Sequence, residues 1–295
     1  MHTTKTHIVP KLHTPIRLQD YGVGIFDAAL TKSALKKVLK KNSVTVNGMV
    51  ATSATFINGG ECISLSIDEE HLPKKTLALQ LKVLFEDDHL AVIHKPAGIL
   101  VSGNRFKTIT NALVRNLKKS TLTDATKPQP VHRLDFETTG VLLVGKTSSS
   151  IRALNKLFEY KNIKKTYYAV TIGKMDCEGE ISTDIDDKTS LSKYILSQTV
   201  PSKRFSTLSL VQLEPHTGRQ HQLRRHLSHI AHPILGDKVY GMEPLILNGK
   251  GLYLHAYSLR FIHPFTQEKL YIKDDLPKRF ENIFEDKINA LTTDS

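Results

Sequence analysis

Tryptophan is absent from the sequence, cysteine is rare, and long apolar runs are missing. The two cysteines, Cys62 and Cys177, lie far apart without a Cys-x-x-Cys spacing, which is typical of free thiols in a reducing compartment. No apolar run approaches the roughly 18 residues that a membrane-spanning helix needs, and residues 1–10 lack the apolar segment of a signal peptide. These absences predict a cytoplasmic protein that does not bind membranes.

Acidic residues are also comparatively scarce. The 295 residues include 41 Lys and Arg but 29 Asp and Glu, which gives a formal net charge of +12. This excess favours an anionic partner, most commonly the phosphate backbone of a nucleic acid. Hydrophobic residues make up 40% of the chain, so it can build a core, and its length favours two unequal domains or one large domain.

One stretch places a single acid between a basic pair and a threonine-rich turn. It reads His132-Arg133-Leu134-Asp135, then Phe-Glu-Thr-Thr-Gly, and then the apolar run 141–144. The apolar run predicts a short strand buried on both faces, which places Asp135 on a loop held by that strand. Because positive neighbours favour a charged carboxylate, we expect Asp135 to be ionised. Taken by itself, such an aspartate would more commonly cap a turn.

Together with the Thr138-Thr139-Gly140 turn, this stretch closely resembles the signature of the RluA-type RNA pseudouridine synthases. The resemblance implies that Asp135 is the catalytic residue. Family members usually have Ser at the position of Thr139, a departure that keeps the hydroxyl group. Later family-like segments extend the resemblance over roughly residues 81–275, and they imply two further site residues.

The first of these segments is a predicted strand that begins near residue 164. Residues 165–169 read Lys-Thr-Tyr-Tyr-Ala and resemble the family motif Lys-x-Tyr-x-Ala, which assigns the catalytic tyrosine to Tyr167. In a strand, Tyr167 and Ala169 share one face while Tyr168 takes the other. Without the family, either tyrosine would more commonly pack in a core.

The second segment, residues 217–224, reads Thr-Gly-Arg-Gln-His-Gln-Leu-Arg and again matches the family closely. The resemblance implies that Arg224 pairs with Asp135 and orients it. The spacing of Thr217 and Gln220 is that of a capping box, which predicts a helix from residue 218.

Residues 16–71 predict a small α/β module. An amphipathic helix is followed by a strand at 44–46 and an Asn47-Gly48 hairpin turn, and this order resembles the S4 RNA-binding module. Gly22 and Gly24 would each cost a helix roughly 1 kcal/mol, so we expect the first helix to be short or broken. The alternative is an ordinary surface helix with a solvated lysine face. The lysines that would contact RNA are Lys36, Lys37, Lys40 and Lys41.

The predicted organisation is a flexible tail over 1–15, the S4-like module over 16–71, a linker over 72–80, a catalytic domain over 81–280 and a C-terminal tail over 281–295. Residues 120–130 are polar and predict a loop that leads into the Asp135 stretch. The fold class is α+β. The resemblance, rather than any periodicity, implies a catalytic domain built on a large, mainly antiparallel mixed sheet with flanking helices.

Two other constellations point to different chemistry. Residues 140–147 satisfy the phosphate-binding pattern GxxxxGK[ST], but strand-like residues occupy the loop positions and the preceding segment is not an apolar strand. A nucleotide-binding protein is therefore the weaker hypothesis. Five histidines between residues 216 and 232 fit no metal-binding spacing, so we expect no metal site there.

The resemblance implies an enzyme that isomerises uridine in RNA to pseudouridine without a metal or nucleotide cofactor. The uridine must leave the RNA stack, and Arg133 is a candidate to fill its place. Large-subunit ribosomal RNA is favoured as the substrate over transfer RNA. A non-catalytic RNA-binding or ribosome-assembly factor is the alternative from a different class. Besides the module lysines, the predicted RNA-binding residues are His132, Arg133, Lys203, Arg204 and Arg219.

Overall fold

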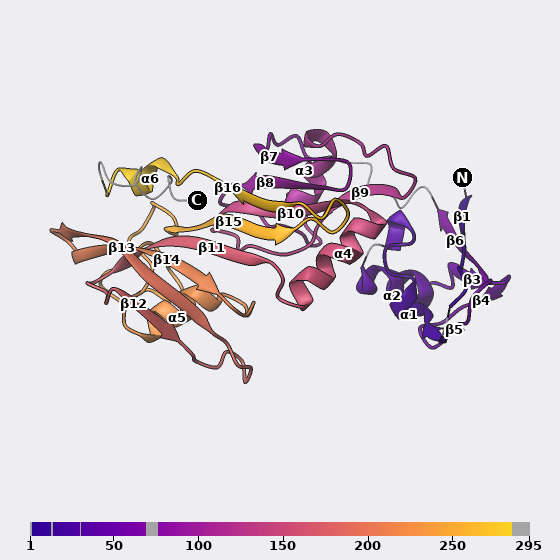
Figure 1. Cartoon of the computed structure of the whole chain (residues 1–295), viewed down its shortest axis with the longest axis horizontal. Coiled ribbons are helices and arrows are strands. Elements are labelled where there is room, and N and C mark those ends of the chain that lie inside the picture. Colours follow the sequence, from indigo (N-terminus) through magenta and orange to yellow (C-terminus); the bar gives the residue numbers. More distant parts are fainter. Residues whose placement is uncertain (1, 13, 30, 69–75, 285–295) are drawn as a thin grey trace.

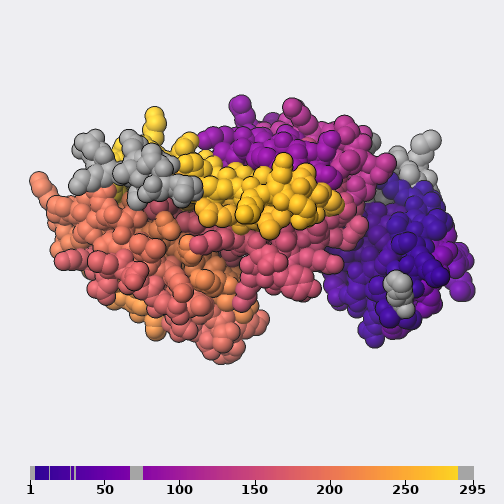
Figure 2. Space-filling model, viewed as in Figure 1, coloured from indigo at the N-terminus to yellow at the C-terminus, as the bar shows by residue number. Residues whose placement is uncertain are grey.

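The computed structural model describes residues 2–12, 14–29, 31–68 and 76–284. They form a small N-terminal module and a larger domain, which Figure 1 shows side by side and Figure 2 shows as two lobes. Among the described residues, no helix is long and apolar enough to cross a membrane.

The N-terminal module is built on a four-stranded sheet with the strand order β1-β6-β3-β4. The basic helix α2 (Lys32–Lys40) buries Leu35 and Leu39 against it, and its four predicted lysines are all exposed. The first helix, α1 (Leu18–Tyr21), is one turn long, as the two glycines predict. The other elements are β1 (His2–Ile8), β2 (Ile16–Arg17), η1 (Asp27–Ala29), β3 (Val44–Val46), β4 (Met49–Val50), β5 (Phe56–Ile57) and β6 (Cys62–Asp68).

The predicted N-terminal tail is wrong for residues 2–8, because β1 pairs antiparallel with β6 along its whole length, from His2 opposite Asp68 to Ile8 opposite Cys62. Strand β3 covers one edge of β6, and β1 satisfies the backbone groups of the other edge. The side chain of Val9, directly after β1, is 1% exposed in the module's core. Strand β1, which is polar and lacks apolar alternation, is therefore stabilised mainly by its backbone hydrogen bonds to β6.

The larger domain is built on a ten-stranded sheet with the order β12-β13-β14-β11-β15-β10-β8-β7, in which β16 adds to β15 and β9 adds to β10. All pairs are antiparallel except that of β10 with β15. This confirms the large mixed sheet. Its strands are β7 (Val83–Glu86), β8 (Leu90–Lys95), β9 (Ala125–Pro130), β10 (Thr139–Thr147), β11 (Lys164–Ile172), β12 (Glu178–Ile181), β13 (Ser192–Ser202), β14 (Ser206–Pro215), β15 (Leu254–Ile262) and β16 (Lys269–Lys273).

Two hydrophobic cores stabilise this sheet. One gathers around β8, β10, α3 (Ile109–Asn116) and α4 (Ser148–Glu159), and the other around β11, β14, α5 (Gln222–His229) and α6 (Lys278–Glu281). Tyr167 packs against both cores. The Asp135 loop belongs to the first half and Arg224 to the second, so the fold brings the two motifs together where the cores meet.

Three predicted boundaries need correction. Residues 125–130 form β9 rather than a loop, an edge strand whose prolines interrupt the usual strand pattern. Of the predicted linker, residues 76–80 lie against the larger domain, where Leu77 donates its N–H to the carbonyl of Asn111, while residues 72–75 lie outside the described residues. Of the predicted C-terminal tail, Phe284 is fully buried in the second core, and residues 285–295 lie outside the described residues.

The GxxxxGK[ST] segment, residues 140–147, is part of β10 and pairs with β8, β9 and β15. Its backbone N–H groups are used in the sheet and cannot cradle a phosphate. The side chain of Lys146 is buried and forms an ion pair with Glu86, with Nζ 2.7 Å from Oε1. The nucleotide-binding hypothesis is therefore excluded for this segment.

Candidate active site

Asp135 lies on the loop between β9 and β10, and a buried lysine donates hydrogen bonds to carbonyl groups of this loop. The side chain of Lys95 is fully buried, and its Nζ donates to the carbonyl oxygens of Pro96 (3.0 Å), Phe136 (3.2 Å) and Thr138 (2.8 Å). Burial lowers the pKa of Lys95 to about 8, although the charge of Asp135 opposes the shift. Lys95 therefore fixes the backbone on the C-terminal side of Asp135.

Helix α5, which carries Arg224, begins at Gln222 rather than at residue 218 as predicted. Thr217 does not cap it, because its hydroxyl accepts from the N–H of Leu191 (3.0 Å) and donates to Oε1 of Gln222 (2.7 Å). The same Oε1 accepts from the N–H of Arg219 (3.0 Å). Residues 217–221 are thus a turn tied together by Gln222, and they line the pocket instead of extending the helix.

Arg224 is within ion-pair distance of three carboxylates, those of Asp237, Asp135 and, at 4.0 Å from its Nη2, Glu137. Its Nη1 is 3.7 Å from Oδ2 of Asp135, and its Nε and Nη2 both donate to Asp237 at 2.7 Å. Burial alone would raise the pKa of Asp237, but the hydrogen bonds from Arg224 and from the backbone N–H groups of Val239 and Tyr240 lower it below its ordinary value. Asp237 therefore fixes the guanidinium, which presents its remaining edge to Asp135.

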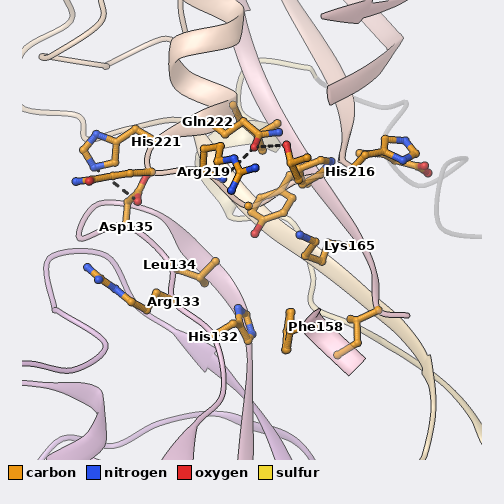
Figure 3. A pocket seen from close by; sticks show the side chains of 18 of the residues that line it. His132, Arg133, Leu134, Asp135, Phe158, Lys165, His216, Arg219, His221 and Gln222 are labelled. Carbon is orange, nitrogen blue, oxygen red and sulfur yellow. Dashed lines mark hydrogen bonds and ion pairs between the residues drawn. The ribbon is translucent and has the colours of Figure 1, made fainter. Parts of the chain in front are cut away.

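His221 is a further site residue that the motifs do not single out. Its Nε2 is 3.7 Å from Oδ1 of Asp135 (Figure 3). Its Nδ1 is 3.0 Å from the hydroxyl of Tyr240. His221 has a φ of +53°, a left-handed conformation that is costly for a residue other than Gly. The two oxygens of Asp135 thus face nitrogen atoms of two different side chains, Arg224 and His221.

Tyr167 lines the pocket from β11, whereas Tyr168 is a core residue. The hydroxyl of Tyr168 donates to Oε1 of Gln212 (3.1 Å), and its ring meets Tyr257 edge to face. Burial and, to a smaller extent, the charge of Asp135 raise the pKa of Tyr167 well above its usual range. The tyrosine that faces the pocket is therefore a neutral phenol.

The predicted RNA-binding residues fall into two groups. Arg133 and Arg219 line the pocket, and Arg219 donates to the carbonyl of Thr189 through Nε (3.2 Å) and Nη2 (3.1 Å). Lys203 and Arg204 are exposed at the tip of the β13–β14 hairpin, and the length of β13, at about 3.3 Å per residue, places the tip about 30 Å from the pocket end of the hairpin. The pocket lining does not include Lys203, Arg204 or the lysines of α2.

His132 also lines the pocket, but the positive charge that we expect it to place beside Asp135 needs correction. Its Nε2 accepts from the N–H of Leu143 (2.9 Å), so this nitrogen carries no proton. Burial lowers the pKa of His132 to about 3, and the ring packs on Phe158 with centroids 4.8 Å apart. His132 is a neutral brace between the loop and β10, and it does not supply charge to Asp135.

The pocket has a volume of about 1240 Å³ and runs from Asp135 and His221 to the segment that joins α4 to β11. Within the described ranges, no group of three or more His, Cys, Asp or Glu side chains could hold a metal ion. Two of the clustered histidines have separate partners: His226 bonds to Ser190 and Ser192, and His232 contacts the carbonyl of Ile172.

Comparison with known proteins gives one consistent result. The family model described as RNA pseudouridylate synthase matches residues 89–229. An uncharacterised RNA pseudouridine synthase of Aquifex aeolicus is 31% identical, covering 86% of this chain and 88% of its own. The ribosomal large subunit pseudouridine synthase D of Vibrio parahaemolyticus is also 31% identical (88% and 87%). The tRNA pseudouridine synthase C of Vibrio vulnificus is 31% identical over 70% of this chain and 94% of its own.

A solved structure supports the same fold. Human RNA pseudouridylate synthase domain containing 4 superposes with a TM-score of 0.54 at 27% identity, covering 68% of this chain and 90% of its own.

Proposed function

Because this chain belongs to the RNA pseudouridine synthase family, we propose that Asp135, Arg224 and Tyr167 isomerise a uridine of large-subunit ribosomal RNA. The observation that carries the proposal is the Asp135 carboxylate in a large pocket, with Arg224 3.7 Å away and held by Asp237. The overall reaction breaks the bond between N1 of uracil and C1′ of ribose and joins C5 to C1′. The C5 proton is lost and N1 gains one, so nothing is consumed.

Each residue has a distinct part in this proposal. Asp135 supplies the carboxylate that acts on the nucleotide while the glycosidic bond breaks. Arg224 keeps that carboxylate oriented, because Asp237 restricts its guanidinium with two hydrogen bonds. Tyr167 stacks on the uracil ring, and its raised pKa favours this stacking over a role as a free base. Arg133, exposed beside Asp135, fills the space that the extruded uridine leaves in the RNA.

The choice of substrate rests on the length of the matches. Relatives named ribosomal large subunit pseudouridine synthase D align with 84–92% of this chain, whereas the relative named for transfer RNA aligns with 70%. The N-terminal module adds a basic surface, which the exposed lysines of α2 form. We infer that the lysines of this S4-like module bind phosphates of ribosomal RNA. The same reaction on transfer RNA is the second candidate, supported by the 31% identity to the transfer RNA enzyme.

The test uses the full chain and RNA from cells that lack it. Wild-type protein should form new pseudouridines in large-subunit ribosomal RNA, and Asp135→Asn should reduce product formation by at least about a thousandfold while RNA binding survives. Asp186→Asn is a matched control, because Asp186 is an exposed aspartate that pairs with Arg225 outside the pocket lining. Retained turnover in Asp135→Asn would refute the catalytic assignment. New pseudouridines confined to transfer RNA would refute the substrate assignment.

A further inference from the structure

The pocket is larger than one nucleotide requires. Its volume of about 1240 Å³ exceeds the roughly 300–1000 Å³ of ordinary small-molecule sites. Asp135 and His221 lie at one end, and Lys165 lies toward the other, near Phe158 (Figure 3). The reacting uridine occupies the Asp135 end. The second end is therefore free to hold another part of the RNA.

Lys165 is the charged group that this second end offers. It lies on β11 two residues before Tyr167, so both side chains project from the same face of the strand, about 7 Å apart along it. Its side chain is half-buried and lines the pocket, and within the described part of the chain it makes no hydrogen bond or ion pair. An ammonium group that loses hydration without gaining a partner is costly, and an incoming anion would remove that cost.

The surrounding charges favour an anion. Burial and the nearby charge of Lys161 lower the pKa of Lys165, so the charge that acts on its ammonium group has the same sign. Besides Asp135, the acids that line the pocket are Glu159, which is exposed, and Glu214, whose Oε1 is 3.1 Å from Nζ of Lys164. His132, on the same wall, is neutral. No acid neutralises Lys165 among the contacts of the described residues.

Lys161 supplies a second observation. It follows the C-terminus of α4 with a φ of +58°, at a position where helices usually place Gly because a side chain strains the backbone. Lys161 is exposed and lines the pocket. It therefore places a positive charge beside the pocket at a position where the backbone conformation favours Gly.

We propose that Lys165, assisted by Lys161, binds the phosphate group that joins the extruded uridine to a neighbouring nucleotide. The proposal rests on the proposed function and deepens it, because it assigns the second end of the pocket to the RNA backbone. Tyr167 would then stack on the uracil base, while Lys165, on the same face of β11, would bind the RNA backbone beside that base. Such a contact fixes the register of the RNA and adds affinity, but it takes no part in bond making.

Binding is measured in the Asp135→Asn background with a short RNA copied from the uridine that the mapping experiment identifies. Lys165→Met should weaken binding about tenfold and reduce the slope of log affinity against log salt by about 0.7, the value for one lost contact to a single strand. Lys165→Arg should restore most of the affinity. Lys156→Met, which removes an exposed lysine of α4 outside the pocket lining, should bind like the parent protein.

A phosphate-specific readout separates this contact from a structural role. RNAs carry a neutral methylphosphonate at one position at a time, on either side of the target uridine. With Lys165 present, one of these methylphosphonates should cost about tenfold in affinity, and in the Lys165→Met variant the same methylphosphonate should cost nothing further. With Asp135 restored, the single-turnover rate of Lys165→Met at saturating RNA should change less than about twofold.

Three outcomes would overturn the proposal: unchanged binding in Lys165→Met, equal methylphosphonate sensitivity with and without Lys165, or a lower saturating rate with unchanged affinity. The last would place Lys165 at the reacting atoms. Failure of the proposed function appears separately, as product formation by Asp135→Asn or as no product from wild type.

Discussion

On the exposed face of α2, Lys36, Lys37, Lys40 and Lys41 extend into solvent, and no ion pair to them is present within the described ranges. In the pocket, by contrast, Arg224 is 3% exposed and its guanidinium lies between Asp237 and Asp135. Solvated charges attract an RNA over a distance but do not orient it. Buried, hydrogen-bonded charges have one geometry, which chemistry on a single base requires. The two basic regions thus have separate roles. The lysines of α2 contribute affinity for RNA, and Arg224 contributes the fixed geometry of the site.

Among the variants that test this difference between the two regions, we expect Asp237→Asn to have the largest effect. It removes the carboxylate that holds Arg224, and breaking such a buried ion pair costs about 3–5 kcal/mol of unfolding free energy. The freed guanidinium no longer orients Asp135, so turnover should fall about a hundredfold. Urea unfolding and single-turnover rates measure the two effects.

The neighbouring residue of α5 offers a matched control. Arg225 forms an ion pair with Asp186 at 2.9 Å, and these side chains are 32% and 67% exposed. Asp186→Asn should therefore change the unfolding free energy by less than about 1 kcal/mol and leave turnover unchanged. Equal losses in the two variants would contradict the distinction between buried and solvated charge.

A smaller effect is expected on the N-terminal side. Replacing Lys36 and Lys40 by Gln should weaken RNA binding about tenfold and lower the salt slope by about 0.7–0.9 per lysine, with the rate at saturating RNA unchanged. The double replacement of Lys203 and Arg204 by Gln removes the same charge at a hairpin tip far from the pocket. That variant should bind within about twofold of wild type. Greater loss at the hairpin than on α2 would reverse the assignment of the RNA surface.

The last effect concerns pH and the neutral brace His132, and it leaves turnover at neutral pH unchanged. Its folded pKa of about 3 lies below the ordinary value of 6.5, so between these values the unfolded chain binds more protons. The stability contributed by His132 is therefore complete above pH 6.5 and is lost as the pH falls toward 3. His132→Gln keeps an acceptor for the N–H of Leu143 and should remove about 2 kcal/mol of this dependence between pH 7 and pH 5. Identical pH profiles of unfolding would contradict the neutral role.

How much of this can be read from the sequence depends on how local each signal is. Asp135, Tyr167 and Arg224 lie in compact motifs, and the structure brings all three to one pocket. The partners that fix them, Lys95 and Asp237, are not predicted because their contacts depend on the tertiary fold. The positive neighbour expected in His132 is neutral for the same reason, since its burial and its bond to Leu143 are set by β10.

Secondary structure shows the same limit. The buried run 141–144 and the Asn47-Gly48 hairpin are recognisable because apolar patterning and turn chemistry specify them locally. The sequence predicts a tail and a loop where the structure has β1 and β9, because both strands are polar. Pairing with a strand distant in sequence holds β1, and pairing of irregular register holds β9. The large sheet of the second domain is predicted from the resemblance to a family, because apolar periodicity does not show which strands pair with one another.

The pairing of β1 with β6 has a practical consequence for producing the protein. Removing residues 2–8, or crowding them with a fused tag, would uncover a long hydrogen-bonding edge of the kind that recruits strands from other chains. Preparations altered at that end are expected to self-associate and to lose RNA affinity together, and a loss of binding in them would say nothing about the lysines.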